Sequence, residues 1–431
     1  MRITIDQLYA LYLETGFVIT DTRKIIPGSI FFALKGENFD GNDFATDALN
    51  LGARYSIVDN PALAEGEKML FVDDTLKALQ DLARFHRNQL NIPVIGITGT
   101  NGKTTTKELI NAVLSRKFKT VATKGNFNNQ IGVPLTLLSV NKATEIAIIE
   151  MGANHEGEIA ALCQIANPEF GIITNIGKAH LEGFGSFEGV IRAKSELFEF
   201  IRASGGQLFV NSDNELLTGL SANISSITYG AKAGALSHGW PQESNPCARL
   251  QWDSPDGLLA IETKLVGAYN FENVMAAICI GQYFGVPSQD ICEAIADYQP
   301  SNNRSQIFNT PKNLVIMDAY NANPTSMKAA ILNFRNMNSQ HKMAILGDMF
   351  ELGKESKNEH AEVVRLIDES NLETVLLIGP RFGTVAIPKH FLAFISAAEA
   401  KLWLTTHPIK GRTILVKGSR GTHLEDILTA L

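Results

Sequence analysis

Residues 96–106, which read GITGTNGKTTT, constrain the fold of this chain more than any other stretch. An apolar run at 94–97 precedes them, and the apolar spacing of residues 104–114 predicts a helix after them. A turn of small residues between a strand and a helix points successive backbone N–H groups into one concavity, where the helix dipole also favours anions. Glycine allows the positive φ angles and the close approach that a phosphate requires. The stretch therefore predicts a phosphate-binding turn.

Lys103 and Thr104 give this turn the chemistry of a nucleotide loop. In such loops the lysine places a charge at the β- and γ-phosphates, and the hydroxyl binds magnesium. The strict P-loop pattern needs glycine where this chain has Ile97, with Gly96 and Gly99 on either side, so the chain carries a relative of that pattern. The alternative is a glycine-rich turn with a chance lysine. The order of strand, turn, Gly-Lys-Thr-Thr and helix favours the binding of ATP with Mg²⁺.

The length of 431 residues predicts about three domains at about 150 residues each. We expect boundaries that give domains 1–88, 89–299 and 300–431. The net charge of −7 and the scattered basic residues argue against a nucleic-acid or membrane-surface partner. The four cysteines form no Cys-x-x-Cys pair, and no signal peptide or membrane-spanning run is visible. These features predict a cytoplasmic protein that is not embedded in a membrane, and we expect a monomer.

The first 88 residues predict short strands between turns, followed by a helix at 75–90. The expected strands are 17–20, 29–34, 55–59 and 69–72. Two polar loops, 21–24 and 35–41, contain basic residues that could hold a phosphorylated ligand or could be solvated turns. Their local chemistry favours solvated turns.

The other two domains alternate strands and helices, which predicts parallel sheets with helices on both faces. The expected strands are 94–98, 120–123, 145–151, 171–175 and 208–211 in the second domain, and 314–318, 343–347, 374–378, 391–394 and 413–417 in the third. We expect an irregular excursion at 231–257 between two edge strands, and a last helix that ends at Leu431. The third domain reads as doubly wound α/β without the Gly-x-Gly-x-x-Gly of an NAD site.

Two polar residues follow buried strands of the second domain. Glu150 emerges from an apolar run, where a charge is costly unless a cation pairs with it. Magnesium held by Thr104 is the partner we expect, and a salt bridge to a basic side chain is the alternative. His180 follows the next strand and should reach the same sheet edge. Lys194 lies on a predicted helix at 187–200, and no spacing rule singles it out.

The domain junctions add three further candidates. Asn270 and Asn273 lie three residues apart at the start of an apolar helix, so one could be its N-cap while the other faces a ligand. Arg304 opens the third domain, where a guanidinium could reach a phosphate across a cleft. We expect the third domain to close on the second about a linker at 298–304.

At residues 98–105 the chain resembles the Mur ligases and their folylpolyglutamate synthase relatives, which are ATP-dependent amide-forming ligases with three domains. The strings DTR, ALKG, FDG, NFNNQIGVP, DAYNANP, LGDM and KGSR, which begin at residues 21, 33, 39, 126, 318, 346 and 417, are similar to the members that add D-alanyl-D-alanine. The resemblance covers the whole chain. It implies a small α/β UDP-binding N-terminal domain, a central P-loop-type ATPase domain with a mostly parallel sheet, and a C-terminal Rossmann-like doubly wound domain.

The resemblance also implies a reaction. D-alanyl-D-alanine would be joined to UDP-N-acetylmuramoyl-tripeptide, giving the pentapeptide precursor of peptidoglycan. The tripeptide carboxylate would attack the γ-phosphate of ATP, and the dipeptide amine would then displace phosphate from the acyl phosphate. Negative charge builds between two anions in both steps, so the site needs cations aimed at the transferring phosphoryl group.

The resemblance assigns roles by position. The expected ATP-binding residues are Gly99, Thr100, Asn101, Gly102, Lys103, Thr104, Thr105, Asn270, Asn273, Arg304 and Asp318, the last at the ribose. The expected magnesium-holding residues are Thr104, Glu150, His180 and Lys194, with Lys194 carbamylated, and the expected catalytic residues are Lys103, Glu150, His180 and Lys194. The expected substrate-binding residues are Thr22 and Arg23 for the UDP end, Asn128 and Asn129 for the muramoyl-peptide, and Asn321, Asn323 and Ser326 for the dipeptide. Thr22 replaces the serine of many relatives and keeps its hydroxyl.

Two other functions stay open. The chain could be a ligase of the same kind that adds another amino acid, such as glutamate, to a different acceptor, although the asparagine-rich strings argue against it. It could also be an inactive scaffold with the same fold, although the presence of Lys103, Glu150, His180 and Lys194 argues against that.

Overall fold

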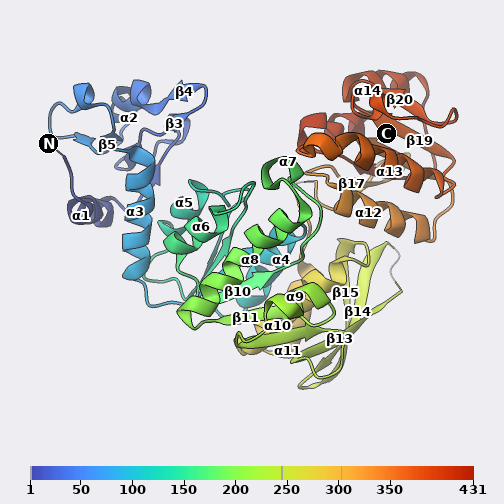
Figure 1. Cartoon of the computed structure of the whole chain (residues 1–431), viewed down its shortest axis with the longest axis horizontal. Coiled ribbons are helices and arrows are strands. Elements are labelled where there is room, and N and C mark those ends of the chain that lie inside the picture. The colour runs from blue at the N-terminus through green and yellow to red at the C-terminus, as the bar shows by residue number, and fades with distance from the viewer. Residues whose placement is uncertain (1, 244–245, 302) are drawn as a thin grey trace.

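Three sheets organise the chain in the computed structural model, which describes residues 2–243, 246–301 and 303–431. Figure 1 shows three lobes, with the N-terminal and C-terminal domains apart from one another and the central domain between them. The fold is α/β with mostly parallel sheets, as the sequence predicts. The boundaries near residues 88 and 300 stay predictions. None of the helices in the described ranges is long and apolar enough to cross a membrane.

The N-terminal domain has a parallel four-stranded sheet in the order β1-β2-β5-β6. Its strands are β1 (Val18–Ile19), β2 (Ile30–Phe32), β5 (Tyr55–Val58) and β6 (Met69–Phe71), with a separate two-stranded pair, β3 (Lys35–Gly36) and β4 (Phe39–Asp40). Its helices are α1 (Ile5–Thr15), α2 (Ala45–Asn50) and α3 (Thr75–Asn88). The sequence interpretation missed α1, although Thr4 and Gln7 form a capping box at its start.

The central domain has a nine-stranded sheet in the order β15-β14-β13-β12-β11-β10-β7-β9-β8. Its parallel part holds β7 (Val94–Thr98), β8 (Thr120–Ala122), β9 (Ile146–Glu150), β10 (Phe170–Ile173), β11 (Gln207–Asn211) and β12 (Ser226–Gly230). Its helices are α4 (Lys103–Leu114), α5 (Gly132–Leu137), α6 (Glu158–Ala166), α7 (Leu181–Phe184), α8 (Phe187–Ser204), α9 (Glu215–Leu220), α10 (Asn270–Tyr283) and α11 (Ser288–Asp297). Strand β7 pairs in parallel with β9 on one side and β10 on the other. The loops that follow these three strands therefore emerge at one edge.

The prediction of an irregular excursion at 231–257 is wrong for most of that stretch. Strands β13 (Ser237–Gln242), β14 (Cys247–Ser254) and β15 (Gly257–Val266) extend the sheet, with β14 antiparallel to both of its neighbours. Burial alternates along β14, which is the period of a half-buried strand. The Gly, Ser and Pro content of the stretch hid that alternation.

The C-terminal domain has a six-stranded sheet in the order β16-β17-β21-β18-β19-β20, parallel except for β16. Its strands are β16 (Gln306–Asn309), β17 (Leu314–Asp318), β18 (Lys342–Gly347), β19 (Thr374–Ile378), β20 (Leu392–Phe394) and β21 (Thr413–Lys417). Helices α12 (Pro324–Asn336) and α13 (Ser356–Asp368) contribute to one of its two apolar clusters, and α14 (Ala397–Thr406) contributes to the other. The predicted last helix is a 3₁₀ segment, Leu424–Ala430.

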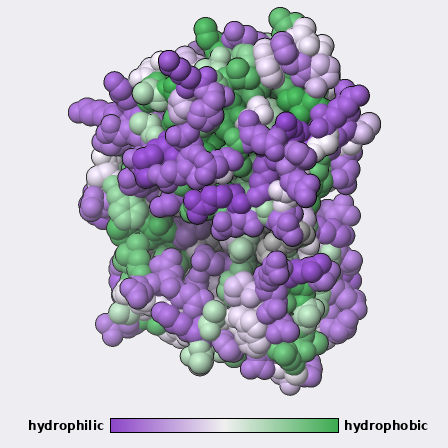
Figure 2. All heavy atoms as spheres, turned by 90° about the vertical axis from the view of Figure 1, so that its right-hand side faces the viewer, coloured by the Kyte–Doolittle hydropathy of each residue, from purple (hydrophilic) through white to green (hydrophobic). Residues whose placement is uncertain are grey.

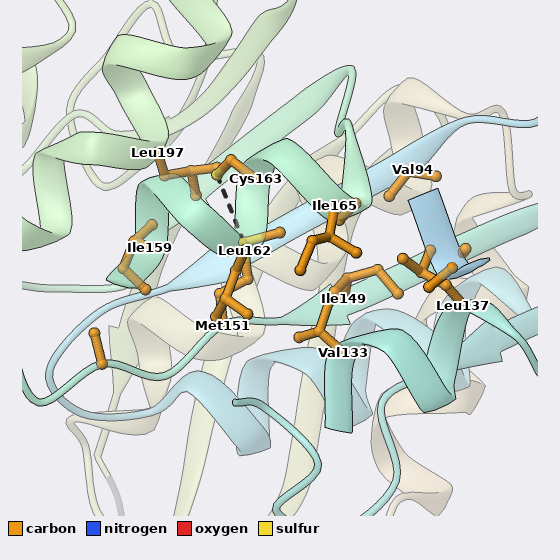
Figure 3. Close-up of a cluster of buried hydrophobic side chains, with 14 of the residues drawn as sticks. Val94, Val133, Leu137, Ile149, Met151, Ile159, Leu162, Cys163, Ile165 and Leu197 are labelled. Atoms are coloured by element: carbon orange, nitrogen blue, oxygen red, sulfur yellow. Dashed lines mark hydrogen bonds between the residues drawn. The ribbon is translucent and has the colours of Figure 1, made fainter. Parts of the chain in front are cut away.

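Helix α3 joins the N-terminal domain to the central one. A single buried cluster runs from Leu8 and Phe32 through Leu79 on α3 to Val133 and Leu137 on α5. Figure 3 shows the central part of this cluster, where the thiol of Cys163 lies 3.7 Å from the sulfur of Met151. The two domains therefore share one core.

Candidate active site between the central and C-terminal domains

A cleft of about 1090 Å³ lies at the sheet edge where β7 and β9 end. The nucleotide loop and the C-terminal domain both contribute to its walls. Most of the residues singled out in the sequence line it, namely Thr100, Asn101, Gly102, Lys103, Thr104, Thr105, Asn128, Asn129, Glu150, His180, Asn270, Asn273, Arg304, Asp318, Asn321, Asn323 and Ser326. The structure thus gathers residues from distant parts of the sequence. Their roles toward ligands stay predictions.

The nucleotide loop has the predicted strand–turn–helix form. Gly102 is the N-cap of α4, with φ of 78°, and Gly99 has φ of 143°. A Cβ on Gly99 would lie 2.1 Å from the hydroxyl of Thr174, so the turn tolerates no side chain there. The Lys103 ammonium donates to the carbonyl oxygens of Gly99, at 2.7 Å, and Thr100, at 3.1 Å. Burial lowers the pKa of Lys103 to about 8.

Glu150 lies at the floor of the cleft, almost fully buried at the end of β9. Its Oε1 accepts hydrogen bonds from the Thr104 hydroxyl, at 3.1 Å, and from Nδ2 of Asn128, at 2.8 Å. Its Oε2 is buried and receives no hydrogen bond from any residue within 2–243, 246–301 and 303–431. Such an oxygen is costly to leave unpaired, and a cation in the cleft would relieve that cost.

A buried lysine gives partial support to the alternative prediction for Glu150, which is a salt bridge to a basic side chain. Lys107 lies 3.9 Å from Oε2 of Glu150, and its ammonium donates to the Thr123 carbonyl at 2.7 Å. The carboxylate therefore forms an ion pair with a buried lysine, while its Oε2 receives no hydrogen bond from the described residues. Among the described residues, no group of three or more His, Cys, Asp or Glu side chains could hold a metal alone. Magnesium is commonly held by one or two carboxylates together with substrate phosphates, which fits a hydroxyl and a carboxylate beside a nucleotide loop.

His180 lies seven residues beyond the end of β10, at the N-cap of α7, with φ of 49°. Its ring lines the cleft, and its Nδ1 pairs with the carboxylate of Glu351 from the C-terminal domain. That pairing lowers the pKa of Glu351. The prediction that this histidine shares an edge with Thr104 and Glu150 agrees with the common lining of the cleft.

Lys194 is nearly fully buried on α8 and does not line the cleft. Its ammonium lies 3.4 Å from the carbonyl oxygen of Ala153, which does line it, and 5.2 Å from the ring centroid of Phe184. Burial, with the nearby positive charge of Lys103, lowers the pKa of Lys194 to about 7. An amine of this kind is partly neutral at neutral pH, so it is unusually nucleophilic for a lysine.

The predicted N-cap role of Asn270 or Asn273 is wrong, because Tyr269 is the N-cap of α10 and no side chain in the described part of the chain caps that helix. Instead the two asparagines hydrogen-bond to each other at 2.9 Å. Oδ1 of Asn273 also accepts a hydrogen bond from Thr106 on α4, at 3.0 Å. The pair therefore packs against the helix that follows the nucleotide loop.

The C-terminal wall of the cleft includes the cations of Arg304 and Lys417. The Arg304 guanidinium stacks 3.6 Å from the ring centroid of Tyr320, and its Nε is buried without a hydrogen-bond partner among the residues that the structure describes. Asp318 accepts from Lys417 at 2.6 Å and from the backbone N–H of Ser305 at 3.2 Å. Arg304 is thus held by stacking, with a donor free for an anion.

The asparagines of the predicted substrate sites have structural partners. Asn323 and Ser326 form the capping box of α12, and Nδ2 of Asn323 donates to Oδ1 of Asn101 in the nucleotide loop at 2.8 Å. Oδ1 of Asn129 accepts from the backbone N–H groups of Ile131 and Gly132 at the start of α5. The C-terminal domain therefore touches the nucleotide loop directly.

Thr22 and Arg23 lie outside this cleft, in a short 3₁₀ segment of the N-terminal domain. Arg23 is exposed and bonded to Asp21 through its Nε, at 2.9 Å. The N-terminal wall of the cleft comes instead from Gln80 and Arg84 on α3.

Sequence reasoning missed several residues of the site. They are Gln80, Arg84, Tyr320 and Lys417, which line the cleft, and Glu351, which pairs with His180. Tyr320 and Lys417 stood inside motif strings that carried a signal. The other three depend on how domains meet, which no local pattern reports.

Three family models match the chain: the Mur ligase family catalytic domain at residues 14–87, the Mur ligase middle domain at 97–281, and the Mur ligase glutamate ligase domain at 303–420. The UDP-N-acetylmuramoyl-tripeptide--D-alanyl-D-alanine ligase of Bacillus subtilis is 36% identical over 96% of this chain and 92% of that protein. The Escherichia coli ligase of the same name is 34% identical over 96% of this chain and 93% of its own.

Solved structures agree with the family models. MurF from Acinetobacter baumannii superposes with a TM-score of 0.86 and 32% identity, covering 97% of both chains. MurF from Thermotoga maritima, in complex with ADP, superposes with a TM-score of 0.85 and 27% identity, covering 97% of both chains. The chain therefore belongs to the Mur ligase family.

Proposed function

We propose that this chain is the ATP-dependent ligase that joins D-alanyl-D-alanine to UDP-N-acetylmuramoyl-tripeptide, forming ADP, phosphate and the UDP-N-acetylmuramoyl-pentapeptide of peptidoglycan synthesis. The observation that carries the proposal is the cleft in which the nucleotide loop, the buried carboxylate of Glu150 and the asparagine-rich loop of the C-terminal domain face one another. The names of the relatives from Bacillus subtilis and Escherichia coli support the choice of substrates.

The proposed activation of the tripeptide takes place at the nucleotide loop. Lys103 leaves the loop carbonyls and binds the transferring phosphoryl group, while Arg304 presents its free donor to phosphate from the opposite wall. Thr104, Glu150 and His180 would hold Mg²⁺, which neutralises charge on the phosphates as the acyl phosphate forms. The rest of the nucleotide is held by the other residues of the nucleotide loop, together with Asn270, Asn273 and Asp318.

In this proposal, UDP-N-acetylmuramoyl-tripeptide and D-alanyl-D-alanine bind on opposite sides of the nucleotide loop. Thr22 and Arg23 hold the UDP end, and Asn128 and Asn129 lie along the muramoyl-peptide. Asn321, Asn323 and Ser326 face the incoming dipeptide, whose amine displaces phosphate. We further propose that the protein acts as a monomer in the cytosol, where its four free thiols are stable.

Lys194 is proposed to carry a carbamate. Its neutral amine adds to CO₂ and loses a proton, which replaces a cation with an oxygen anion. Its lowered pKa, of about 7, supplies the neutral amine that this addition needs. We expect Lys194→Ala to lose about 10²-fold or more in turnover, the scale of one lost transition-state group. Added short-chain carboxylates should restore part of that activity, and full activity without them would refute the role.

A phosphate-release assay tests the function. Purified protein with ATP, Mg²⁺ and UDP-N-acetylmuramoyl-tripeptide, carrying lysine or diaminopimelate, should release phosphate in step with the dipeptide supplied, and mass spectrometry should find the pentapeptide. A ligase for another amino acid would ignore D-alanyl-D-alanine and respond to glutamate. An inactive scaffold would give no product with any of these mixtures.

A further inference from the structure

The segment that carries His180 is pressed between the central and C-terminal domains, as the position of α7 in Figure 1 shows. Lys178 Nζ pairs with Glu359 on α13 at 2.8 Å, and its backbone N–H donates to the Thr325 hydroxyl at 3.0 Å. The backbone N–H of Glu182 donates to the carbonyl of Glu351 at 3.2 Å. The partners of this segment thus come from three separate parts of the C-terminal domain.

Glu351 is fixed to the body of the C-terminal domain. It follows Asp348, whose fully buried carboxylate accepts from the backbone N–H groups of Arg381, at 3.0 Å, and Phe382, at 3.1 Å. Glu351 itself has φ of 61°, a conformation that a non-glycine residue keeps only where its surroundings hold it. The loop that carries Glu351 is therefore anchored in the C-terminal domain through Asp348.

The carboxylate of Glu351 meets one nitrogen of the imidazole, Nδ1. A carboxylate on one ring nitrogen of a metal-binding histidine fixes the tautomer and the ring orientation and raises the basicity of the other nitrogen. Nε2 of His180 is then the nitrogen left for a ligand in the cleft. Here the orienting carboxylate belongs to a different domain from the imidazole.

We propose that Glu351 is a positioning residue for His180, supplied by the C-terminal domain, so that the metal-binding geometry of the central domain is complete only when the two domains are docked. The inference rests on the proposed function for the presence of a metal at His180. Through this contact, binding of the divalent metal and docking of the C-terminal domain would each favour the other. Substrate activation would then be delayed until the C-terminal domain has engaged.

Mn²⁺ binding without turnover tests this role. The electron paramagnetic resonance signal of free Mn²⁺ is titrated with full-length protein in the presence of the non-hydrolysable β,γ-imido analogue of ATP. We expect Glu351→Ala to weaken Mn²⁺ binding about 10-fold or more, the scale for a lost orienting partner. Glu351→Gln keeps an acceptor for Nδ1–H, so it should recover part of that loss.

Two control variants separate positioning from general loss of contact. Lys178→Ala removes another ion pair across the same interface and leaves Glu351 in place. Glu373→Ala removes a Glu–His pair of similar chemistry, Oε1 of Glu373 to Nδ1 of His341 at 3.0 Å, on the surface of the same domain. Both should change Mn²⁺ binding less than about 3-fold. Unchanged Mn²⁺ binding in Glu351→Ala, or a loss in Lys178→Ala as large as in Glu351→Ala, would overturn the proposal.

The test distinguishes this inference from the ligase assignment. Mn²⁺ binding that depends on Glu351 in a protein that makes no pentapeptide would overturn the proposed function and support the positioning role. If the protein makes the pentapeptide while Glu351→Ala leaves Mn²⁺ binding unchanged, the ligase function would be supported and the positioning role overturned. Circular dichroism of each variant establishes that it is folded before either result is read.

Discussion

The two interfaces of the central domain differ in kind. Toward the N-terminal domain, buried apolar side chains form one continuous cluster, and the Tyr12 hydroxyl donates to the Leu138 carbonyl at 2.7 Å within it. Toward the C-terminal domain, ion pairs and hydrogen bonds dominate, such as Lys178 with Glu359, although Val266 at the end of β15 joins the C-terminal core. Figure 2 shows the outer face of the molecule on the C-terminal side, where hydrophilic side chains cover much of the surface between smaller hydrophobic areas.

The apolar interface and the polar interface should therefore respond differently to a shift of one domain against the other. An apolar interface loses its contacts when its halves shift, whereas exposed ion pairs cost little to break and remake. The cleft of the candidate active site lies at the polar interface. We therefore expect the N-terminal and central domains to form a rigid platform, and the C-terminal domain to move against it.

The largest expected effect on stability lies at the apolar interface. Leu79→Ala removes a fully buried side chain from the shared cluster and should lower the free energy of unfolding by about 2–5 kcal/mol. Denaturant titration measures it, with the exposed Leu402→Ala on α14 as the control. A loss as small as that of Leu402→Ala would break the claim of a shared core. The turnover of the folded Leu79→Ala protein should change little.

Lys103→Ala should show the opposite behaviour. Turnover in the phosphate-release assay should fall about 10²-fold or more, because one donor to the transferring phosphoryl group is lost. Its free energy of unfolding should change by about 1 kcal/mol or less, since the ammonium donates to two carbonyl oxygens of its own loop. If Lys103→Ala turned over as fast as the unchanged protein, the proposed role of Lys103 in binding the phosphoryl group would be contradicted.

A smaller effect is expected at the polar interface. Lys178→Gln breaks the pair with Glu359, and the lysine side chain is 55% exposed, so solvent screens the interaction. We expect a loss of less than about 1 kcal/mol in the free energy of unfolding. Several kcal/mol in the same denaturant titration would mean that this interface is as rigid as the other one.

The smallest effect is a pH dependence of the apolar interface. His86 on α3 is bonded to the Val140 carbonyl at 2.9 Å, and burial lowers its pKa. The unfolded chain therefore binds more protons than the folded one just below about pH 6.5, so stability falls as the pH drops through that value.

The His86→Gln variant isolates that contribution. It should lose stability less steeply between about pH 6.5 and 5, with a difference below about 1.4 kcal/mol per pH unit. His360, whose pKa burial also lowers, keeps its own contribution in both proteins. Identical pH profiles would show that His86 titrates alike in the folded and unfolded chains.

Local patterns sufficed where one strand or one turn decides the structure. Strands Val94–Thr98 and Leu314–Asp318 have the predicted bounds, and α4 begins one residue before its predicted start. The N-terminal helix α1 was missed because the stretch before the predicted helix at 75–90 was interpreted as strands and turns.

The cleft itself could be predicted only in part. Parallel strand ends explain why Thr104 and Glu150 meet, since β7 and β9 are neighbours. The pairing of His180 with Glu351 joins residues of different domains, and the mutual bonding of Asn270 and Asn273 replaces the expected cap. Such contacts depend on domain packing, which sequence periodicity does not encode.

Small-angle X-ray scattering tests the moving-domain account most directly. Linker residues 298–304, of which 302 lies outside the described residues, would serve as the hinge. Addition of the β,γ-imido ATP analogue with UDP-N-acetylmuramoyl-tripeptide should reduce the radius of gyration as the C-terminal domain closes on the platform. A scattering profile that these ligands leave unchanged would contradict the account.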